Sequence, residues 1–400
     1  MSDNNARYAE LDFLRGFAVL GIFQINIFYF GQPFEIYNFP TLLGQHEFVN
    51  ALAWFYTTLF VEGTMYGLFS LLFGVSAMIL LQQVAYDSPN GVAAVDRYYR
   101  RMLWLLFFGL LHAYFLLSPM EILYTYAVLG LFLFPLRNLS AISLVIIGSL
   151  LVVIGAIDLV FIEKANANFI DTGQQNDLYS SVMVDLNLYH SSYLEIFFEN
   201  IGLASQWQTQ NFFEDQLYDS AGLMLIGMAL YKMGVITGQK STRYYLVMSV
   251  MGYLAGFLLR WPTAMTYYQS GFDPIVFEQL PTGINLIGRI FIIFGHIGLL
   301  ISLFRVDFFQ KALLILAKTG KMALTHYLMQ TLFAIFLFYG FGLGKFGTFE
   351  RYQLLITALG FGLMQVLFSL VWLRYFYFGP LEWFWRSLIF KQMQPLKIKS

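Results

Sequence analysis

The stretch GTMYGLFSLLFGVSAMILLQQVAY, residues 63–86, contains no Asp, Glu, Lys or Arg. A helix that crosses the roughly 30 Å hydrocarbon core of a bilayer needs about 20 consecutive, mostly apolar residues, and this stretch meets that requirement. The whole chain has a similar character, because 58% of its 400 residues are hydrophobic and only 12% are charged. Soluble globular domains are much richer in charge. The sequence therefore predicts an all-α polytopic membrane protein.

Nine further stretches without acidic or basic residues complete a predicted bundle of about ten transmembrane helices. Residues 48–61 are too short for a span and are expected to form a re-entrant or interfacial segment. Residues 193–213 mix aromatic and polar side chains, as does a helix that lies on a membrane surface. The ten predicted spans cover residues 17–34, 63–86, 102–120, 122–136, 138–157, 220–231, 244–259, 290–304, 322–344 and 352–373.

The distribution of basic residues predicts the orientation, since cytoplasmic loops collect Lys and Arg. With the amino terminus inside, ten spans place most basic residues on the cytoplasmic side and return the carboxy terminus there as well. We therefore expect both termini in the cytoplasm and the protein in the inner membrane of a bacterium. Of the 23 basic residues, the outer side keeps only Lys164, Arg260, Arg289, Lys345 and Arg351.

A polar segment divides the predicted spans into two groups of five. Residues 1–162 form the first membrane half, residues 163–219 an outer-face segment with an interfacial helix, and residues 220–400 the second membrane half with a cytoplasmic tail. The segment is expected to fold over the outer mouth of the bundle, and a plain surface linker is the alternative. Its densest run of hydrogen-bonding groups contains Trp207, a candidate substrate contact.

Polar side chains at bilayer depth are the candidate functional residues, because each costs a few kcal/mol to insert and needs a partner or a purpose. His112 lies far from any charge on its own helix, and Glu121 follows after a short outer hairpin. An imidazole beside a carboxylate is a usual arrangement for a general base. Helix packing is the alternative for His112, as it is for Arg289, which is also a candidate substrate contact.

The first predicted helix carries a second group of candidates. Asp12 and Arg15 are three residues apart and can form an ion pair, which would either anchor the helix end or offer Arg15 to an anionic ligand. Asn26 lies nearer the outer half, and a helix-packing hydrogen bond is its alternative role.

Composition and spacing exclude other classes of site. The chain has no cysteine, which excludes disulfides, thiolate catalysis and Cys-ligated metals. The histidines do not share a helical face at metal-ligand spacing, so no metal is expected. The net charge of −1 and the lack of a basic cluster give no reason to expect nucleic acid.

Five blocks spread along the chain resemble the YeiB-like family of bacterial membrane proteins, also called domain of unknown function 418. One of them contains Gln330, which we take as a candidate substrate contact. The blocks are residues 11–27 (LDFLRGFAVLGIFQINI), 68–74 (LFSLLFG), 109–112 (GLLH), 320–330 (GKMALTHYLMQ) and 379–386 (GPLEWFWR).

The family is itself similar to transmembrane acyltransferases, which move an acyl group from cytoplasmic acyl-CoA to an acceptor, commonly a sugar. In the sugar branch a catalytic His ends the first-helix motif, where this chain has Asn26. An amide is no base near neutral pH, so the base would be His112, which matches a family position. The chain also departs from the family pattern in having Glu121 where an Asp is usual, Gly63-Thr64-Met65 in place of Gly-Lys-Phe, and His326 in place of an Asn.

The resemblance implies that acyl-CoA is the donor, that His112 and Glu121 are catalytic, and that Asn26 stabilises the oxyanion. The expected partners are membrane lipids, acyl-CoA, an outer-face acceptor such as a sugar or glycan and, as an alternative to a monomer, a second copy of the chain. A transporter of a small anionic or lipid-linked solute is the alternative function, since Arg15 and Arg289 also suit a solute pathway. A scaffold whose polar groups only lock helices together is a third interpretation.

Overall fold

The computed structural model describes residues 2–44, 47–87, 92–167 and 174–398, and helices account for most of them. No strand occurs in these ranges. The first-half helices are α1 (Ser2–Gly31), α2 (Phe34–Asn38), η1 (Pro40–Leu43), α3 (Phe48–Tyr56), η2 (Thr57–Val61), α4 (Thr64–Asp87), α5 (Val92–Phe115), α6 (Ile122–Leu136) and α7 (Ala141–Ala167). The second-half helices are α8 (Gln174–Tyr189), α9 (Tyr193–Gln208), η3 (Phe212–Gln216), α10 (Leu217–Lys232), α11 (Thr242–Gln269), α12 (Pro274–Phe277), α13 (Thr282–Phe304), α14 (Asp307–Lys321), α15 (Ala323–Phe338), α16 (Arg351–Tyr375) and α17 (Pro380–Phe390).

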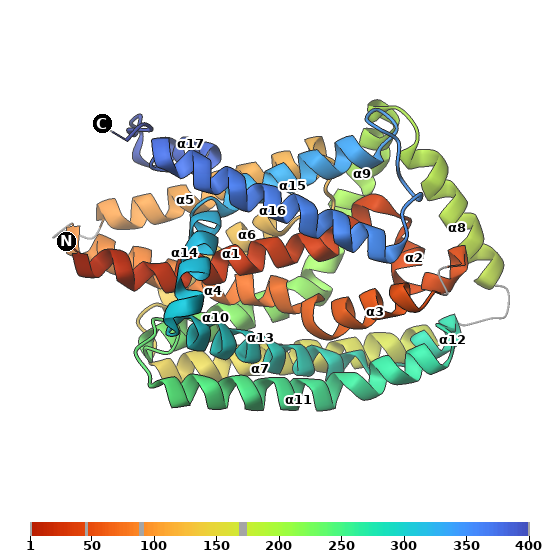
Figure 1. Ribbon diagram of the computed structural model, residues 1–400, viewed down its shortest axis with the longest axis horizontal. Helices are drawn as coiled ribbons and strands as arrows, with labels where there is room; N and C mark the ends of the chain where they lie inside the picture. Colours follow the sequence, from red (N-terminus) through yellow and green to blue (C-terminus); the bar gives the residue numbers. More distant parts are fainter. Residues whose placement is uncertain (1, 45–46, 88–91, 168–173, 399–400) are drawn as a thin grey trace.

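The long helices run along one axis of the molecule, and both termini lie at the same end of it (Figure 1). We call this the terminal end. Helices α2, α8 and α12 lie at the opposite end, and α14 crosses the bundle instead of running with it.

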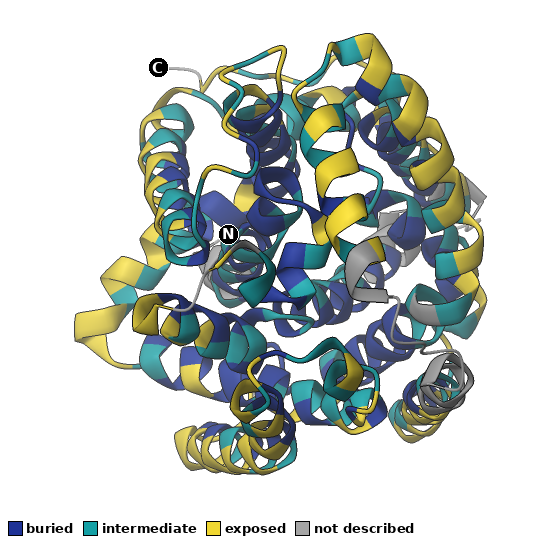
Figure 2. Ribbon diagram, turned by 90° about the vertical axis from the view of Figure 1, so that its right-hand side faces the viewer, coloured by how far each residue is buried: buried dark blue, intermediate teal, exposed yellow. Residues whose placement is uncertain are grey.

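Apolar side chains cover the outside of the bundle as well as its interior. Exposed leucine and valine side chains recur every four residues along α11 and α16, so each helix presents an apolar stripe outward. Figure 2 shows the buried residues gathered at the centre and the exposed residues on the outer sides of the peripheral helices. A soluble protein rarely exposes apolar surface of this extent, so the stripes are faces for lipid. The stripes comprise Leu246, Val250, Leu254 and Leu258 on α11 and Leu359, Leu363, Leu367 and Val371 on α16.

Among the described residues, five helical runs are long and apolar enough to cross a membrane: Ala9–Gly31, Phe48–Leu81, Ala141–Leu159, Thr282–Phe304 and Arg351–Tyr375. The pair α14 and α15 makes a sixth if its two helices, bent by 77° at Met322, are counted as one broken span. The chain is therefore a multi-pass membrane protein. The predicted count of ten spans remains a prediction.

Several other predicted spans are helical but are too short or too charged to count among these membrane-crossing runs. Helix α10 has 16 residues and α6 has 15, α5 carries three arginines in its first half, and α11 contains Arg243 and Arg260. Residues 48–61 differ from the expectation in another way. The π-helical turn η2 joins α3 almost directly to α4, so this segment extends the next apolar run.

The described part of residues 163–219, the predicted outer-face segment, is mostly helical, and α8 and α9 pack toward the end opposite the termini. The Asn200 side chain of α9 donates to the carbonyl of Ala113 on α5, at 2.8 Å. The Tyr193 hydroxyl donates to the carbonyl of Phe115, at 2.9 Å. The Ser181 hydroxyl of α8 donates to the Glu35 carboxylate of α2. These bonds hold α8 and α9 against the ends of the apolar helices.

Candidate functional site

A cavity of about 590 Å³ lies toward the terminal end of the bundle, and we call it the inner cavity. Its walls come from α1, α4, α5, α6, α14, α15 and α17, which are far apart in the sequence. Its polar lining residues are Asp12, Arg15, Ser76, Arg97, Arg101, Tyr126, Lys321, Tyr327, Glu382 and Arg386, and most of the remaining lining residues are apolar.

The inner cavity has a basic lining, with five cationic side chains against two carboxylates. Asp12 and Arg15 form the predicted ion pair, at 2.8 Å, and Arg15 also donates to the Ser76 hydroxyl at 3.0 Å. The guanidinium of Arg101 lies 4.5 Å from the centre of the Trp385 ring, a stacking that fixes its plane. Positive charge in excess favours an anionic ligand.

Beyond these cations the cavity wall is apolar, with Val19 and Ile22 of α1, Phe69 and Phe73 of α4, and Leu324 of α15. The cavity is therefore amphipathic, with charged groups from α1, α5, α14 and α17 and hydrocarbon walls elsewhere. An amphiphile with an anionic head and an apolar chain suits such a lining.

His112 and Glu121, the predicted catalytic pair, meet in space. The Nδ1 atom of His112 lies 3.7 Å from Oε1 of Glu121, and Nε2 lies 2.8 Å from the hydroxyl of Thr331. Glu121 also caps α6, because its carboxylate accepts from the backbone N–H groups of Leu123 and Tyr124. The hydroxyl, the imidazole and the carboxylate lie in a row, but Nδ1 has no hydrogen-bond partner in the described part of the chain, so the two side chains have to approach before a proton could pass between the imidazole and the carboxylate.

This row is buried and does not line the inner cavity. The His112 side chain has no solvent exposure. The ring of Tyr327 packs against it at 4.9 Å between ring centres, and Tyr327 itself lines the cavity. One side chain thus lies between the imidazole and the cavity.

The other predicted contacts on α1, α9 and α15 lie elsewhere. Asn26 is one helical turn beyond Ile22 on the same face of α1 and does not line any of the described cavities. The Gln330 side chain donates to the carbonyl of Val19 and to the Gln365 amide oxygen, so it ties α15 to α1 and α16. Trp207 lies half-buried on α9, away from the described cavities.

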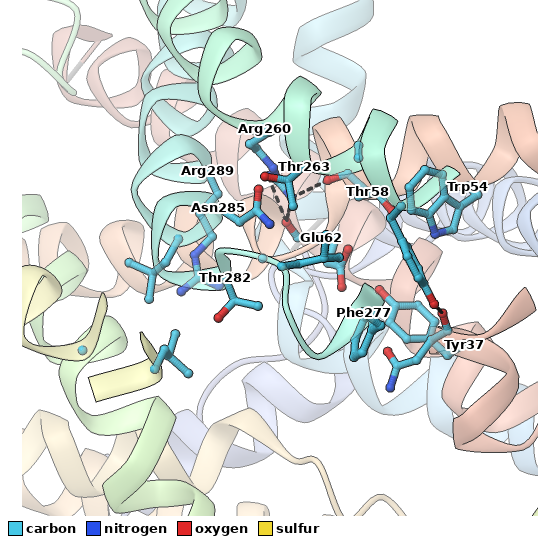
Figure 3. Close-up of a pocket in the computed structure, with 18 of the residues that line it drawn as sticks. Tyr37, Trp54, Thr58, Glu62, Arg260, Thr263, Phe277, Thr282, Asn285 and Arg289 are labelled. Carbon is cyan, nitrogen blue, oxygen red and sulfur yellow. Dashed lines mark hydrogen bonds between the residues drawn. The ribbon is translucent and has the colours of Figure 1, made fainter. Parts of the chain in front are cut away.

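A second cavity, about 410 Å³ in volume, lies toward the other end between η2, α11 and α13, and we call it the outer cavity. Figure 3 shows Arg289, Asn285, Arg260 and Glu62 around it. Arg289 lies here and not in the inner cavity, and its Nη2 is 2.7 Å from the Asp219 carboxylate of α10. The outer cavity thus contains the predicted contact Arg289 but is separate from Asp12 and Arg15.

Gly63 forms part of the outer cavity wall at the break between η2 and α4. Its φ of +69° lies in the left-handed region, which residues with a side chain rarely adopt. A Cβ atom at this position would lie 2.6 Å from Nη1 and 2.7 Å from Cδ of Arg289. Glycine is needed here for both reasons, because the guanidinium packs directly on the turn.

The sequence did not reveal the cavity residues that come from the carboxy-terminal block. The block 379–386 carries the family resemblance, but the sequence alone gives no role to its members Glu382, Trp385 and Arg386. Thr331 gave no signal of its own, because a threonine in an apolar helix is common. Among the described residues, no three His, Asp or Glu side chains are close enough to hold a metal ion.

A family model described as "Protein of unknown function (DUF418)" matches residues 230–392. YeiB of Escherichia coli (strain K12) is 30% identical over 98% of this chain and 99% of its own length. YxaH of Bacillus subtilis (strain 168) is 26% identical over 99% of this chain and 97% of its own. Both are described as uncharacterized, and no solved structure matches the chain. On the strength of this end-to-end similarity, the chain belongs to the YeiB-like DUF418 family of proteins.

Proposed function

We propose that the protein is a membrane-embedded acyltransferase that takes an acyl group from cytoplasmic acyl-CoA. The inner cavity is the observation that carries the proposal, since it combines five cationic side chains with apolar walls. The phosphates of CoA would contact Arg101 and Arg386, and the acyl chain would lie along α1 and α4. Charge-assisted hydrogen bonds from guanidinium groups are among the strongest contacts for phosphate.

The proposed membrane arrangement is that of ten spans with both termini in the cytoplasm of a bacterium. Most basic residues then lie on the side of the terminal end, as expected for the cytoplasmic face of an inner membrane. The basic lining of the inner cavity would face the compartment in which acyl-CoA is made. The outer cavity would face the other side, where the acceptor is expected.

In the proposed reaction, the acceptor hydroxyl adds to the thioester carbonyl, a C–O bond forms and the C–S bond breaks. His112 takes the hydroxyl proton and delivers it to the leaving thiolate, while Glu121 stabilises the imidazolium. Asn26 donates to the oxyanion from α1. Tyr327 and Thr331 have to release His112 before it can act, so the reactive state requires a movement of α15.

Binding of palmitoyl-CoA to the purified protein in nanodiscs tests the donor site. We expect that Arg101→Gln and Arg386→Gln each weaken binding about tenfold or more, because each removes a hydrogen bond to a charged group. Arg243→Gln is the matched control, since Arg243 is exposed on α11 and does not line the cavity. Equal affinity of the wild type and of a variant that carries both substitutions, Arg101→Gln and Arg386→Gln, would exclude this donor site.

The role of His112 is tested by acyl transfer and by hydrolysis of bound acyl-CoA. The variant His112→Gln should keep donor binding and lose turnover. Full turnover in this variant would exclude His112 as the base.

A transporter is the second candidate, and one observation favours it. A buried polar chain lies between the two cavities: Asp219 pairs with Arg289 of the outer cavity, and the neighbouring Ser220 hydrogen-bonds with Tyr66. Ser70 bonds to the hydroxyl of Tyr126, which lines the inner cavity, at 2.7 Å. Tyr126 also donates to the Tyr66 carbonyl, at 3.1 Å. Liposome uptake of an unmodified anionic solute without CoA would support this function against acyl transfer.

A further inference from the structure

We infer that the outer cavity is a binding site for a neutral, polyhydroxylated ligand, a sugar. Its volume of about 410 Å³ is in the range of small-molecule sites, about 300–1,000 Å³. The inference rests on the charge, the hydrogen-bonding groups and the aromatic side chains of this cavity. It requires no acyl donor, although a sugar bound here would be the acceptor in the proposed function.

The charge of the outer cavity differs from that of the inner cavity. Two arginines, Arg260 and Arg289, are matched by two glutamates, Glu62 and Glu214, and Arg289 is further neutralised by Asp219 at 2.7 Å. With Asp219 counted, three carboxylates stand against two arginines, so the site gives no net attraction to a phosphate or carboxylate. It therefore favours a ligand without net charge.

The hydrogen-bonding groups suit hydroxyls, which both donate and accept. Glu62 accepts, while Thr263 and Asn285 can do both, and all three line the cavity. Arg260 is 5% exposed, and its Nη atoms donate to the backbone carbonyls of Thr58 and Glu62, which fixes the guanidinium. Its Nε and the Nε of Arg289 are buried without a hydrogen-bond partner in the described part of the chain. Because these two atoms are buried, a ligand in the cavity would instead contact the carboxylate of Glu62 and the polar groups of Thr263 and Asn285.

Aromatic side chains form one wall of the cavity. Trp54 and Tyr267 have ring centres 6.0 Å apart, and Tyr267 and Phe277 are 5.3 Å apart. The view in Figure 3 places Trp54, Tyr37 and Phe277 on the side opposite Arg289. An aromatic face carries negative potential, so the weakly positive C–H groups of a sugar ring pack on it. Polar groups on one side and rings on the other match the two kinds of surface of a sugar.

Saturation-transfer NMR on the full-length protein in phosphatidylcholine nanodiscs, free of sugar-based detergent, tests this site. The probes are glucose, N-acetylglucosamine, maltose and inorganic phosphate. We expect at least one sugar to bind and phosphate not to compete with it. The variants Glu62→Gln and Trp54→Leu should each weaken sugar binding about tenfold or more, while Arg243→Gln, an exposed position that lines neither cavity, should leave it unchanged.

Two outcomes would overturn the inference. One is the absence of binding by all three sugars to wild-type protein that thermal unfolding shows to be folded. Binding of palmitoyl-CoA to the same sample reports separately on the donor site. The other is sugar binding that both outer-cavity variants retain in full. Thermal unfolding of each variant shows whether a loss of binding comes from a loss of folding, and Asn285→Ala offers a further probe from α13.

Discussion

At the scale of a single residue, Glu121 caps one helix and lies beside a histidine of another. Its carboxylate caps the amino terminus of α6 through two backbone N–H groups, and it lies 3.7 Å from the imidazole of His112. The cap alone explains why an acidic residue is buried at the start of an apolar helix. The sequence could predict the hairpin that brings Glu121 to His112. Spacing alone could not show that the same carboxylate also caps α6.

Replacing Glu121 separates these roles. We expect Glu121→Ala to lower the free energy of unfolding by about 0.5–2 kcal/mol, the usual cost of a lost cap. Glu121→Asp should retain most of the stability, because Asp is a strong capping residue. Urea unfolding in detergent, followed by helical circular dichroism, measures the difference. Equal stability of the Ala variant and the wild type would contradict the capping role.

Asp185 of α8 gives a pH dependence at the opposite end of the molecule. Burial and the nearby Glu35 carboxylate raise its pKa from 3.8 to about 6. Because the folded state then holds a proton more tightly than the unfolded chain, the stability from this group is full below pH 3.8 and is lost as pH rises through about 6.

The test compares wild type with Asp185→Asn. The wild type should lose stability between about pH 4 and about pH 7 relative to the variant, which has no carboxylate to ionise. Thermal unfolding midpoints at the two pH values measure this. A difference between the two proteins that stays constant with pH would argue against a raised pKa for Asp185.

At the scale of the element, the bend at Met322 sets the geometry of the second half of the chain. Hydrophobicity predicted a span in residues 322–344, and α15 lies within it. The crossing helix α14 was not predicted, because Lys311, Lys318 and Lys321 separate its apolar residues. Its path depends on a close contact with α1 at Gly16 and Gly320, which sequence periodicity does not encode.

The contact between α1 and α14 leaves no room for side chains. A Cβ atom at Gly320 would lie 1.7 Å from the carbonyl oxygen of Asp12, so one of the two helices has to shift. We expect Gly320→Ala to lower the free energy of unfolding by about 1–3 kcal/mol, the usual cost of overpacking, and to disturb Asp12 and Arg15 in the inner cavity.

Gly360 on α16 provides the matched control, since nothing lies within 4 Å of a Cβ built there. Gly360→Ala should be neutral or stabilise the protein by up to about 1 kcal/mol, because alanine favours the helix. Thermal unfolding of both variants measures the contrast. Equal unfolding midpoints for the two variants would contradict the close contact.

At the scale of the whole molecule, the candidate site depends on segments that the sequence places far apart. Composition was enough to predict an all-helical membrane protein, and the Asp12–Arg15 ion pair followed from spacing. The inner cavity was not predicted, since it needs Arg101 of α5 and Arg386 of α17 beside α1. Such long-range packing depends on the fit between side chains of distant segments, and it leaves no local pattern in the sequence.

The orientation of the molecule can be measured directly, because the chain has no natural cysteine. Lys345 and Gln392 are both exposed. Lys345 lies in the connection between α15 and α16 and Gln392 follows α17, and this connection and the end of α17 lie toward opposite ends of the bundle (Figure 1). In right-side-out membrane vesicles, a membrane-impermeant maleimide should label Lys345→Cys at once and Gln392→Cys only after permeabilisation. The reverse order would contradict cytoplasmic termini, and immediate labelling of both would contradict an arrangement with these positions on opposite sides.

Gly63 limits how the outer cavity can diverge among related proteins. A side chain at this turn would be strained by the backbone conformation and would displace the packed Arg289. A lineage that acquired a new ligand at this cavity is expected to do so through its other lining residues, for example those of α11 and α13, with glycine kept at position 63. Replacement of this glycine would mark the proteins in which the pairing of Arg289 with Asp219 has been abandoned.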